Sequence, residues 1–215
     1  MEQDIFSAIS AGDSGKIKAL ITQHPDAARV RNPAGVSALM QARYENKLDI
    51  VELLRNATGE LDVFEAAALG DVAQLRTLVA SDLHLVEAQS SDGFTPLHLA
   101  CFFGQAEAAE FLVQQEADPN AVSPSRIAII HSAAASRNAA IVKLVLQAGA
   151  NPNLKQQGGY TALHEAAMHN SVERAQALLA AGADPAIRSD EGLTAAEMAA
   201  QKGNKEVLEL LQGSS

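Results

Sequence analysis

The sequence predicts an all-α fold, a solenoid of stacked antiparallel helix pairs with short β-hairpin or loop fingers between them. Similar blocks of sequence lie about 33 residues apart through the second half of the chain. Aromatic residues make up only 4% of the chain and Trp is absent, so Ala and Leu must pack closely set helices. The predicted helices are also shorter than the roughly 12–15 residues that an isolated helix needs, so stacked neighbours must hold them in place.

Histidine sets the spacing of the repeat. His98, His131 and His164 recur at one constant interval, and Glu197 holds the same position one interval further on. The blocks around them read TPLHLA, AIIHSA, TALHEA and TAAEMA, and between the blocks lie ADPN, GANPN and GADP. Four concordant copies predict one structural unit per period.

These blocks resemble the ankyrin family, whose repeat runs about 33 residues with a T-P-L-H-x-A opening and a G-A-D-x-N loop. The resemblance is close over residues 92 to about 211. It implies one helix pair and one finger per unit, and a structural histidine that hydrogen-bonds the neighbouring loop. It also implies a protein partner, held by the finger tips and by the outward face of each first helix. The fifth unit departs from the pattern at residues 128–130, where Thr and Pro would be expected.

The first half of the chain is a more divergent copy of the same pattern. At one constant offset, Gly35 corresponds to Gly93 and Leu39 to Leu97, so residues 4–55 look like an earlier copy of 62–113. We therefore predict a single domain over residues 1–215, with seven units at about 1–33, 34–59, 60–91, 92–124, 125–157, 158–190 and 191–212.

One junction between these units is too short for a finger. The landmarks that divide the units, at positions 12, 46, 70, 104, 137, 170 and 203, are evenly spaced except for one much shorter step from Asn46 to Gly70. This shortened junction near residue 59 predicts a missing or shrunken finger within residues 56–62. It also predicts an interrupted row of fingers, which shifts the expected binding surface to units three to six.

Capping residues predict where the helices begin and end. Thr95 precedes Pro96, which is tolerated at the first helical position because its missing N–H has no intrahelical role. Gly104 ends that short helix in the way that a left-handed cap requires. Asp62, with Glu65 three residues later, predicts an N-cap with its capping-box partner.

Composition and charge exclude several classes of function. The net charge is −10 and Lys and Arg form no run, which disfavours nucleic acid and anionic membrane surfaces as partners. No apolar stretch approaches the roughly 18 residues of a membrane span, and the N-terminus lacks the pattern of a secretory signal. Cys101 is the single cysteine, so a reducing compartment is expected. We expect a monomeric cytoplasmic protein that resists self-association.

The residues that could carry chemistry also have structural interpretations. Stacked helices lie roughly 8–10 Å apart, too far for three histidines to share a metal with bonds of about 2.0–2.1 Å. His164 and His169 are five residues apart, whereas the zinc-protease helix needs them at i and i+4. Cys101 beside His98 could form a nucleophile pair, but a buried thiol fits the repeat better. We predict no catalytic residue, no metal, no cofactor and no enzymatic activity.

The remaining candidates are side chains that the repeat framework does not use. Aromatic and Met side chains at exposed positions of consecutive units would form one apolar strip, which is typical of the core of a binding patch. Alternatively some of them pack locally, as expected for one of the two adjacent phenylalanines. The candidate residues for partner binding are Tyr44, Phe94, Phe102, Phe103, Ile127, Tyr160, Met168 and His169.

The sequence therefore predicts a protein–protein interaction module, a scaffold that binds an unidentified protein partner through a concave groove and loop tips, without catalysis. The alternative function is a regulatory subunit or inhibitor of a partner enzyme. Activity at Cys101 or at the histidines is a third hypothesis, which their packing roles disfavour.

Overall fold

The computed structural model describes residues 2–213. Fourteen α-helices form within that range, together with three 3₁₀ helices at Pro25–Arg29, Leu83–Glu87 and Gln157–Gly159. The α-helices are α1 (Glu2–Ala11), α2 (Ser14–Gln23), α3 (Ala38–Tyr44), α4 (Leu48–Thr58), α5 (Val63–Leu69), α6 (Val72–Ser81), α7 (Pro96–Phe102), α8 (Ala106–Gln114), α9 (Ile129–Ala135), α10 (Ala139–Gln147), α11 (Ala162–Met168), α12 (Val172–Ala180), α13 (Ala195–Lys202) and α14 (Lys205–Gly213).

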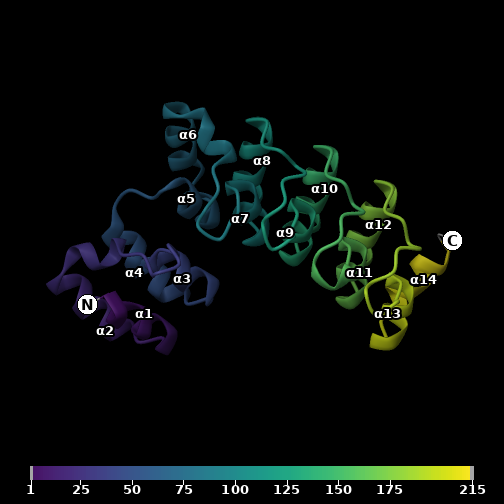
Figure 1. The fold of residues 1–215 in the computed structure, drawn as a ribbon, viewed down its shortest axis with the longest axis horizontal. Helices are drawn as coiled ribbons and strands as arrows, with labels where there is room; N and C mark the ends of the chain where they lie inside the picture. The colour runs from purple at the N-terminus through teal and green to yellow at the C-terminus, as the bar shows by residue number, and fades with distance from the viewer. Residues whose placement is uncertain (1, 214–215) are drawn as a thin grey trace.

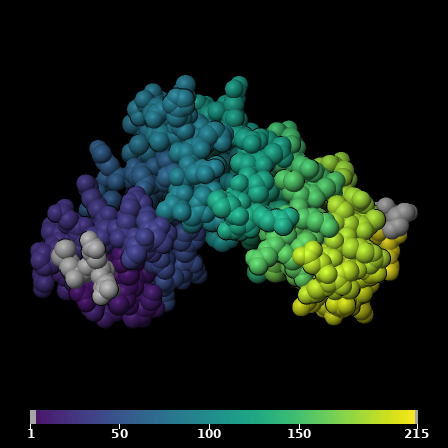
Figure 2. All heavy atoms as spheres, in the orientation of Figure 1, coloured from purple at the N-terminus to yellow at the C-terminus, as the bar shows by residue number. Residues whose placement is uncertain are grey.

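The helices form consecutive antiparallel pairs stacked into an arch (Figure 1). Odd-numbered helices contact one another in sequence along the inner side, and even-numbered helices form a second layer on the outer side. The two ends of the chain curve toward the same side, which leaves a hollow below the middle pairs (Figure 2). The all-α solenoid predicted from the repeat period is confirmed.

The core is a continuous layer of small and branched side chains between the helices. Alanines at the same position of successive inner helices are completely or almost completely buried, including Ala100, Ala133, Ala166 and Ala199. Because these residues have no side chain beyond Cβ, neighbouring helices approach closely, and each short helix is stabilised by burial against the next pair.

The predicted caps are present at the helix ends. The Thr95 hydroxyl accepts from the backbone of His98, with Pro96 in the first helical turn of α7. The Asp62 carboxylate accepts from the backbone N–H of Glu65 at 2.8 Å, and the Glu65 carboxylate accepts from Asp62 N–H at 3.2 Å. This capping box starts α5 directly after the short junction, as the sequence predicts.

The finger between α4 and α5 is missing, because only residues 59–62 connect the two helices. The prediction of an interrupted row of fingers is nevertheless wrong. A Cβ placed on Gly35 would lie 2.8 Å from Cβ of Ser91, so the loop before α3 packs directly against the loop before α7. Since the intervening pair contributes no finger, the fingers on either side of it come together.

Each repeat histidine joins one pair to the next. Nδ1 of His98 accepts from the Thr95 N–H at 3.2 Å, so Nε2 carries the proton and donates to the Ile127 carbonyl at 3.0 Å. His131 and His164 are held in the same way, by the carbonyls of Leu154 at 2.9 Å and Leu193 at 3.0 Å. All three rings are buried, and burial lowers the pKa of each imidazole, for His98 to about 4.

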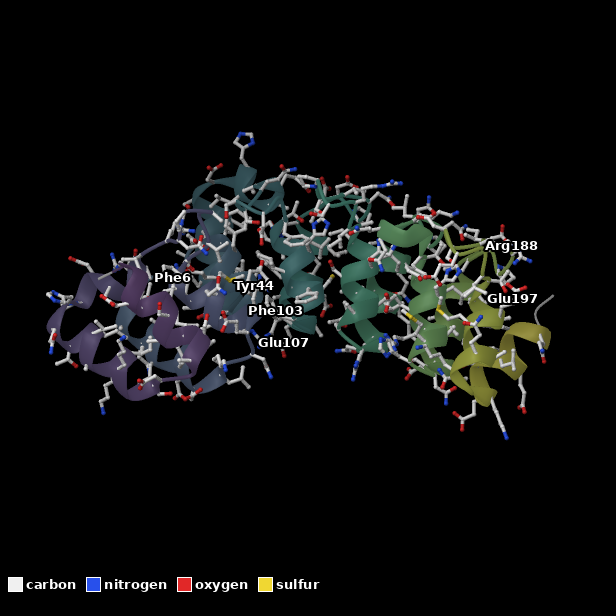
Figure 3. All side chains as sticks on the ribbon, turned by 60° about the horizontal axis from the view of Figure 1, so that its bottom comes forward. Phe6, Tyr44, Phe103, Glu107, Arg188 and Glu197 are labelled. Carbon is white, nitrogen blue, oxygen red and sulfur yellow. The ribbon has the colours of Figure 1, made fainter. Side chains whose placement is uncertain are left out.

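Two further positions show how the histidine position tolerates change. At the start of α9, Ala128 replaces the usual Thr, but its N–H still donates to Nδ1 of His131 at 3.1 Å. The helix therefore begins at Ile129, directly after Ala128. In the last pair, Glu197 of α13 replaces histidine and accepts from Nη1 of Arg188, in the loop directly before that helix, at 2.8 Å (Figure 3).

The free carbonyls at the ends of inner helices are capped by side chains from the following pair. Gln105 donates to the Ala68 carbonyl at 3.2 Å, and Asn204 donates to the Ala167 carbonyl at 2.8 Å. Each donor stands 37 residues after its acceptor. The last carbonyls of a helix lack the usual i+4 backbone partner, and these bonds add a partner from the following pair.

Arg174 performs this capping from an unusual place. The residue at the corresponding position after Ala134 is Ser171, whose side chain is short, and Nη1 of Arg174 on α12 donates to the Ala134 carbonyl instead. Arg174 is 3% exposed and occupies the position that Ile141 and Val207 hold one period before and after it. Its Nε has no hydrogen-bond partner within the described chain, and burial lowers the pKa of its guanidinium.

We expect Arg174→Ile to stabilise the fold by about 1 kcal/mol or more, because it removes a buried charge with an unpartnered donor from an aliphatic position. The loss of the bond to the Ala134 carbonyl offsets part of the gain. Equilibrium urea unfolding checks this, with Arg174→Ala as the comparison, which should destabilise through the cavity it leaves. A lower free energy of unfolding for the isoleucine variant would show that the buried guanidinium is net stabilising.

Candidate partner-binding surface

An apolar cavity of about 250 Å³ lies among residues of α3, α7 and α9 and of the loops before α7 and α9. Four predicted partner-binding residues line it: Tyr44, Phe94, Phe102 and Ile127. They come from three different helix pairs, so the cavity exists only when those pairs are stacked. We call this space the inner cavity.

The repeat explains how these side chains reach one place. Tyr44, Phe102 and Ala135 are the last residues of α3, α7 and α9, which is the same position in each inner helix. Phe94 and Ile127 are equivalent residues of two successive fingers, one period apart. Phe102 is 46% exposed, so its ring is open to a partner rather than used by the core.

Tyr44 reaches across the pair that lacks a finger. Its hydroxyl donates to the Asp92 carboxylate at 2.8 Å, and its ring lies 5.5 Å from that of Phe103 (Figure 3). Burial, together with the Asp92 carboxylate, raises the pKa of the Tyr44 phenol, so the hydroxyl stays a donor. The contact forms because the pair between α3 and α7 contributes no finger to separate them.

Phe103 supports the cavity from behind instead of lining it. Its ring meets Phe102 edge-on at 5.0 Å, and the Arg43 guanidinium lies 4.4 Å from its centroid. Phe103 is half-buried, while Phe102 is exposed. Of the two adjacent phenylalanines, Phe103 is therefore the one that packs locally, and Phe102 is the one that lines the cavity.

The remaining three candidates lie further along the arch and do not line the inner cavity. Tyr160 packs against the His164 ring at 5.8 Å, and half-buried Met168 is the last residue of α11. The His169 ring is exposed, with Nε2 3.6 Å from the Glu165 carboxylate. They extend the row of candidate positions by one helix pair.

Sequence reasoning missed polar groups of the inner cavity. Ser132 lines it, is only 2% exposed, and its hydroxyl forms no side-chain hydrogen bond within residues 2–213. Gln156 also lines it and donates to the Glu165 carboxylate at 3.1 Å. The position of Ser132 directly after the repeat histidine was the available signal, since Leu99 stands there one period earlier.

Groups that could carry chemistry are engaged in structure. Cys101 is fully buried, and burial raises the pKa of its thiol, while both ring nitrogens of His98 hold hydrogen bonds. Within the described range, no three His, Cys, Asp or Glu side chains are grouped to hold a metal ion. None of the helices in that range is long and apolar enough to cross a membrane.

Comparison with known proteins adds an independent observation. The family model described as ankyrin repeats (3 copies) matches residues 5–123 and 129–215. The chain is 30% identical over 108 residues to the human protein named DNA-binding protein RFXANK, a match that covers 49% of this chain and 42% of that protein. It is 33% identical over 81 residues to human Ankyrin repeat family A protein 2, covering 38% of this chain and 25% of that protein.

A third relative is Ankyrin repeat and SAM domain-containing protein 6 from Danio rerio, 31% identical over 97 residues. That match covers 40% of this chain and 13% of that protein. The chain thus matches less than half the length of each of these curated relatives.

Proposed function

The chain belongs to the ankyrin-repeat family, and from that premise we propose that it is a protein–protein interaction module. It binds a partner protein through its concave groove and finger tips and does not catalyse a reaction. We place it in the cytoplasm as a monomer, in keeping with one buried cysteine and a net charge of −10.

The observation that carries this proposal is the inner cavity. Its walls are mainly aromatic and branched side chains, and among them Phe102 remains 46% exposed. Contiguous apolar surface that is exposed to water is unfavourable unless a partner covers it. Patches of this kind are therefore typical of the centre of an interface. The surrounding finger residues supply a polar rim, the usual arrangement around such a centre.

Direct binding to nucleic acid is disfavoured by charge, although one relative carries "DNA-binding" in its name. A protein that binds phosphates must present enough Lys and Arg to replace counterions. This chain has 16 Lys and Arg against 26 Asp and Glu, and hence a net charge of −10. A protein partner fits the surface better.

The double variant Phe102→Glu with Tyr160→Glu should abolish capture of partner proteins from a lysate of the source organism, because it places two charges in the groove. Bound proteins are identified by mass spectrometry, and circular dichroism checks that the helices remain. The matched control is Leu83→Glu, which changes a side chain 70% exposed on the 3₁₀ helix Leu83–Glu87, outside the cavity. If the double variant and the wild type capture the same proteins equally, the groove around Phe102 and Tyr160 is not the binding surface and this proposal is wrong.

A further inference from the structure

We propose that the inner cavity binds one large apolar side chain of an extended partner segment, which carries Lys or Arg a few residues to either side of it. This inference rests on the protein-binding function proposed above, and it names the chemistry of the partner. Size, polarity, a free hydroxyl and the local distribution of charge each support one part of it.

The size of the cavity matches a side chain. Its volume is about 250 Å³, whereas pockets that enclose a whole small-molecule ligand measure about 300–1,000 Å³. An apolar cavity of about 150 Å³ is already large enough to bind benzene. The inner cavity therefore has room for an isobutyl, phenyl or indole group whose chain continues outside it.

The walls of the cavity favour an apolar occupant. Phe94, Phe102 and Ile127 present carbon surface, and the imidazoles of His98 and His131 also line the space. Both nitrogens of each imidazole are bound to backbone groups, so these rings offer no hydrogen bond to a ligand. A charged or strongly polar group placed there would lose its hydration without finding a partner.

One polar group in the wall remains available. The Ser132 hydroxyl forms no hydrogen bond inside the described part of the chain, although the residue is 2% exposed and lines the cavity. A hydroxyl in the wall of a cavity can donate to or accept from a bound group. It can bind the backbone of an extended segment, or the N–H of an indole, as the apolar group enters.

Two carboxylates accept hydrogen bonds from side chains of the cavity wall, Tyr44 and Gln156. Asp92, which holds Tyr44, accepts from the Tyr44 and Ser90 hydroxyls, and Glu165, next to Gln156, accepts from that amide. Neither carboxylate pairs with a Lys or Arg between residues 2 and 213. Carboxylates without a Lys or Arg partner, bonded to the wall of an apolar cavity, complement a segment with a central apolar residue and basic neighbours.

Arg174 and Arg137 lie near Glu165, because the charges of Glu165 and Arg137 both act on the Arg174 guanidinium. The other basic groups near the cavity are held by carbonyls or line a different hollow. The Arg43 guanidinium donates to the carbonyls of Ala68 and Phe103. Arg126 and Lys155 line a separate hollow at the finger tips, and Lys155 is bound to a finger carbonyl at 2.9 Å. The net charge of −10 adds long-range attraction for a basic segment, which salt will screen.

The probe is a set of fluorescent nine-residue peptides, degenerate except at three positions. The central residue is Leu, Phe, Trp or Ala, and the residues three places to either side are both Lys or both Glu. Binding to the full chain is followed by fluorescence anisotropy at low and high salt. We expect Lys-flanked peptides with a large apolar centre to bind at least about tenfold more tightly than Ala-centred or Glu-flanked ones, with affinity falling as salt rises.

Two variants locate the binding site, each with a matched control. Ala135→Phe fills the cavity from an exposed position and should weaken binding about tenfold or more. Gln201→Phe adds the same ring at the equivalent position two pairs away and should change nothing. Asp92→Asn with Glu165→Gln should remove the preference for Lys flanks, whereas Glu52→Gln with Glu60→Gln, which removes two exposed charges elsewhere, should keep it.

Four outcomes would overturn the inference: no measurable binding of any peptide, equal binding of Ala-centred peptides, a preference for Glu flanks, or binding that Ala135→Phe leaves unchanged. The broader function is judged separately by protein capture. If capture depends on Phe102 and Tyr160 while no peptide binds, the interaction module stands and only the basic, apolar-anchored partner is ruled out.

Discussion

The folded chain should lose stability as the pH falls from about 6.5 toward 4, and His98→Gln should make that loss smaller. The imidazoles of His98, His131 and His164 are buried and neutral, and burial lowers the pKa of each. A free histidine has a pKa of about 6.5, so below that pH the unfolded chain binds protons that the folded chain does not. The stabilisation is fully present above pH 6.5 and declines as the pH falls through the folded values.

The size of the effect follows from the pKa of about 4 for His98. A difference of about 2.5 units from 6.5 corresponds to about 3 kcal/mol at full protonation, and the other two rings act in the same direction. The glutamine side chain can replace both hydrogen bonds of His98 but does not titrate. The slope of stability against pH should therefore be shallower for His98→Gln than for the wild type.

Carboxylates also contribute to the dependence of stability on pH. Burial raises the pKa of Glu65, so its contribution is present at low pH and is lost as the pH rises, opposite to the histidines. Hydrogen bonds lower the pKa of Asp71 and Glu197, so their contributions decline only below about pH 4.5. Above about pH 4.5 Glu65 therefore opposes the histidines, and the difference between the wild type and His98→Gln isolates the contribution of the imidazole.

Urea unfolding at half-unit pH steps measures this profile. The control His84→Gln removes an exposed imidazole and should leave the profile unchanged. A flat wild-type profile between pH 6.5 and 4.5, or a His98→Gln profile as steep as the wild type, would show that these rings do not govern acid stability.

Gly93→Ala should destabilise the fold by about 3 kcal/mol. Gly93 has φ of +80°, and an added Cβ would lie 2.3 Å from Cδ and 2.8 Å from Cγ of Pro124 in the next finger. The left-handed backbone costs a residue with a side chain about 1–2 kcal/mol, and overpacking against a rigid ring adds about 1–3 kcal/mol. The variant tests whether close contact between fingers holds successive pairs together.

Gly104→Ala is the matched control for that contact. Gly104 has a similar φ of +76°, but nothing lies within 4 Å of an added Cβ. It should lose only about 1–2 kcal/mol, the cost of the backbone conformation. Equal losses in urea unfolding for the two variants would mean that the contact with Pro124 relaxes freely.

Gly93→Ala should also affect the binding surface. Phe94 follows Gly93 directly, and Ile127 lies in the finger that contains Pro124. Both side chains line the inner cavity. Gly93→Ala displaces these two fingers and should therefore bind peptides more weakly than the wild type, even where the protein remains folded. Gly104→Ala should bind peptides as the wild type does.

Local features of the sequence were reliable because the interactions behind them are local. The Thr95 cap before Pro96 and the capping box of Asp62 and Glu65 each involve residues a few positions apart, and the regular spacing of the histidines repeats one such local pattern. The same short range made the missing finger visible as a shortened step near residue 59. A repeat also requires that each unit bury its neighbour's face, so the fold follows once the period is recognised.

Contacts between pairs that are not consecutive were not predictable in this way. The bond from Tyr44 to Asp92 spans 48 residues and skips a whole helix pair. It forms because the missing finger lets the fingers on either side come together. The repeat spacing of the sequence does not indicate how close those two loops then lie. The buried Arg174 is similar: its bond to the Ala134 carbonyl depends on the shortness of Ser171, on the same helix pair.

By itself, the sequence determined the all-α repeat and its helix ends, placed the histidines at their structural positions, and supplied a set of candidate partner-binding residues. Only the tertiary structure decided that Tyr44, Phe94, Phe102 and Ile127 enclose one cavity with Ser132, and that Phe103 packs behind it. Helix formation and capping depend on neighbours along the chain. A cavity depends instead on the angles and distances between stacked pairs, which side chains from several pairs set together.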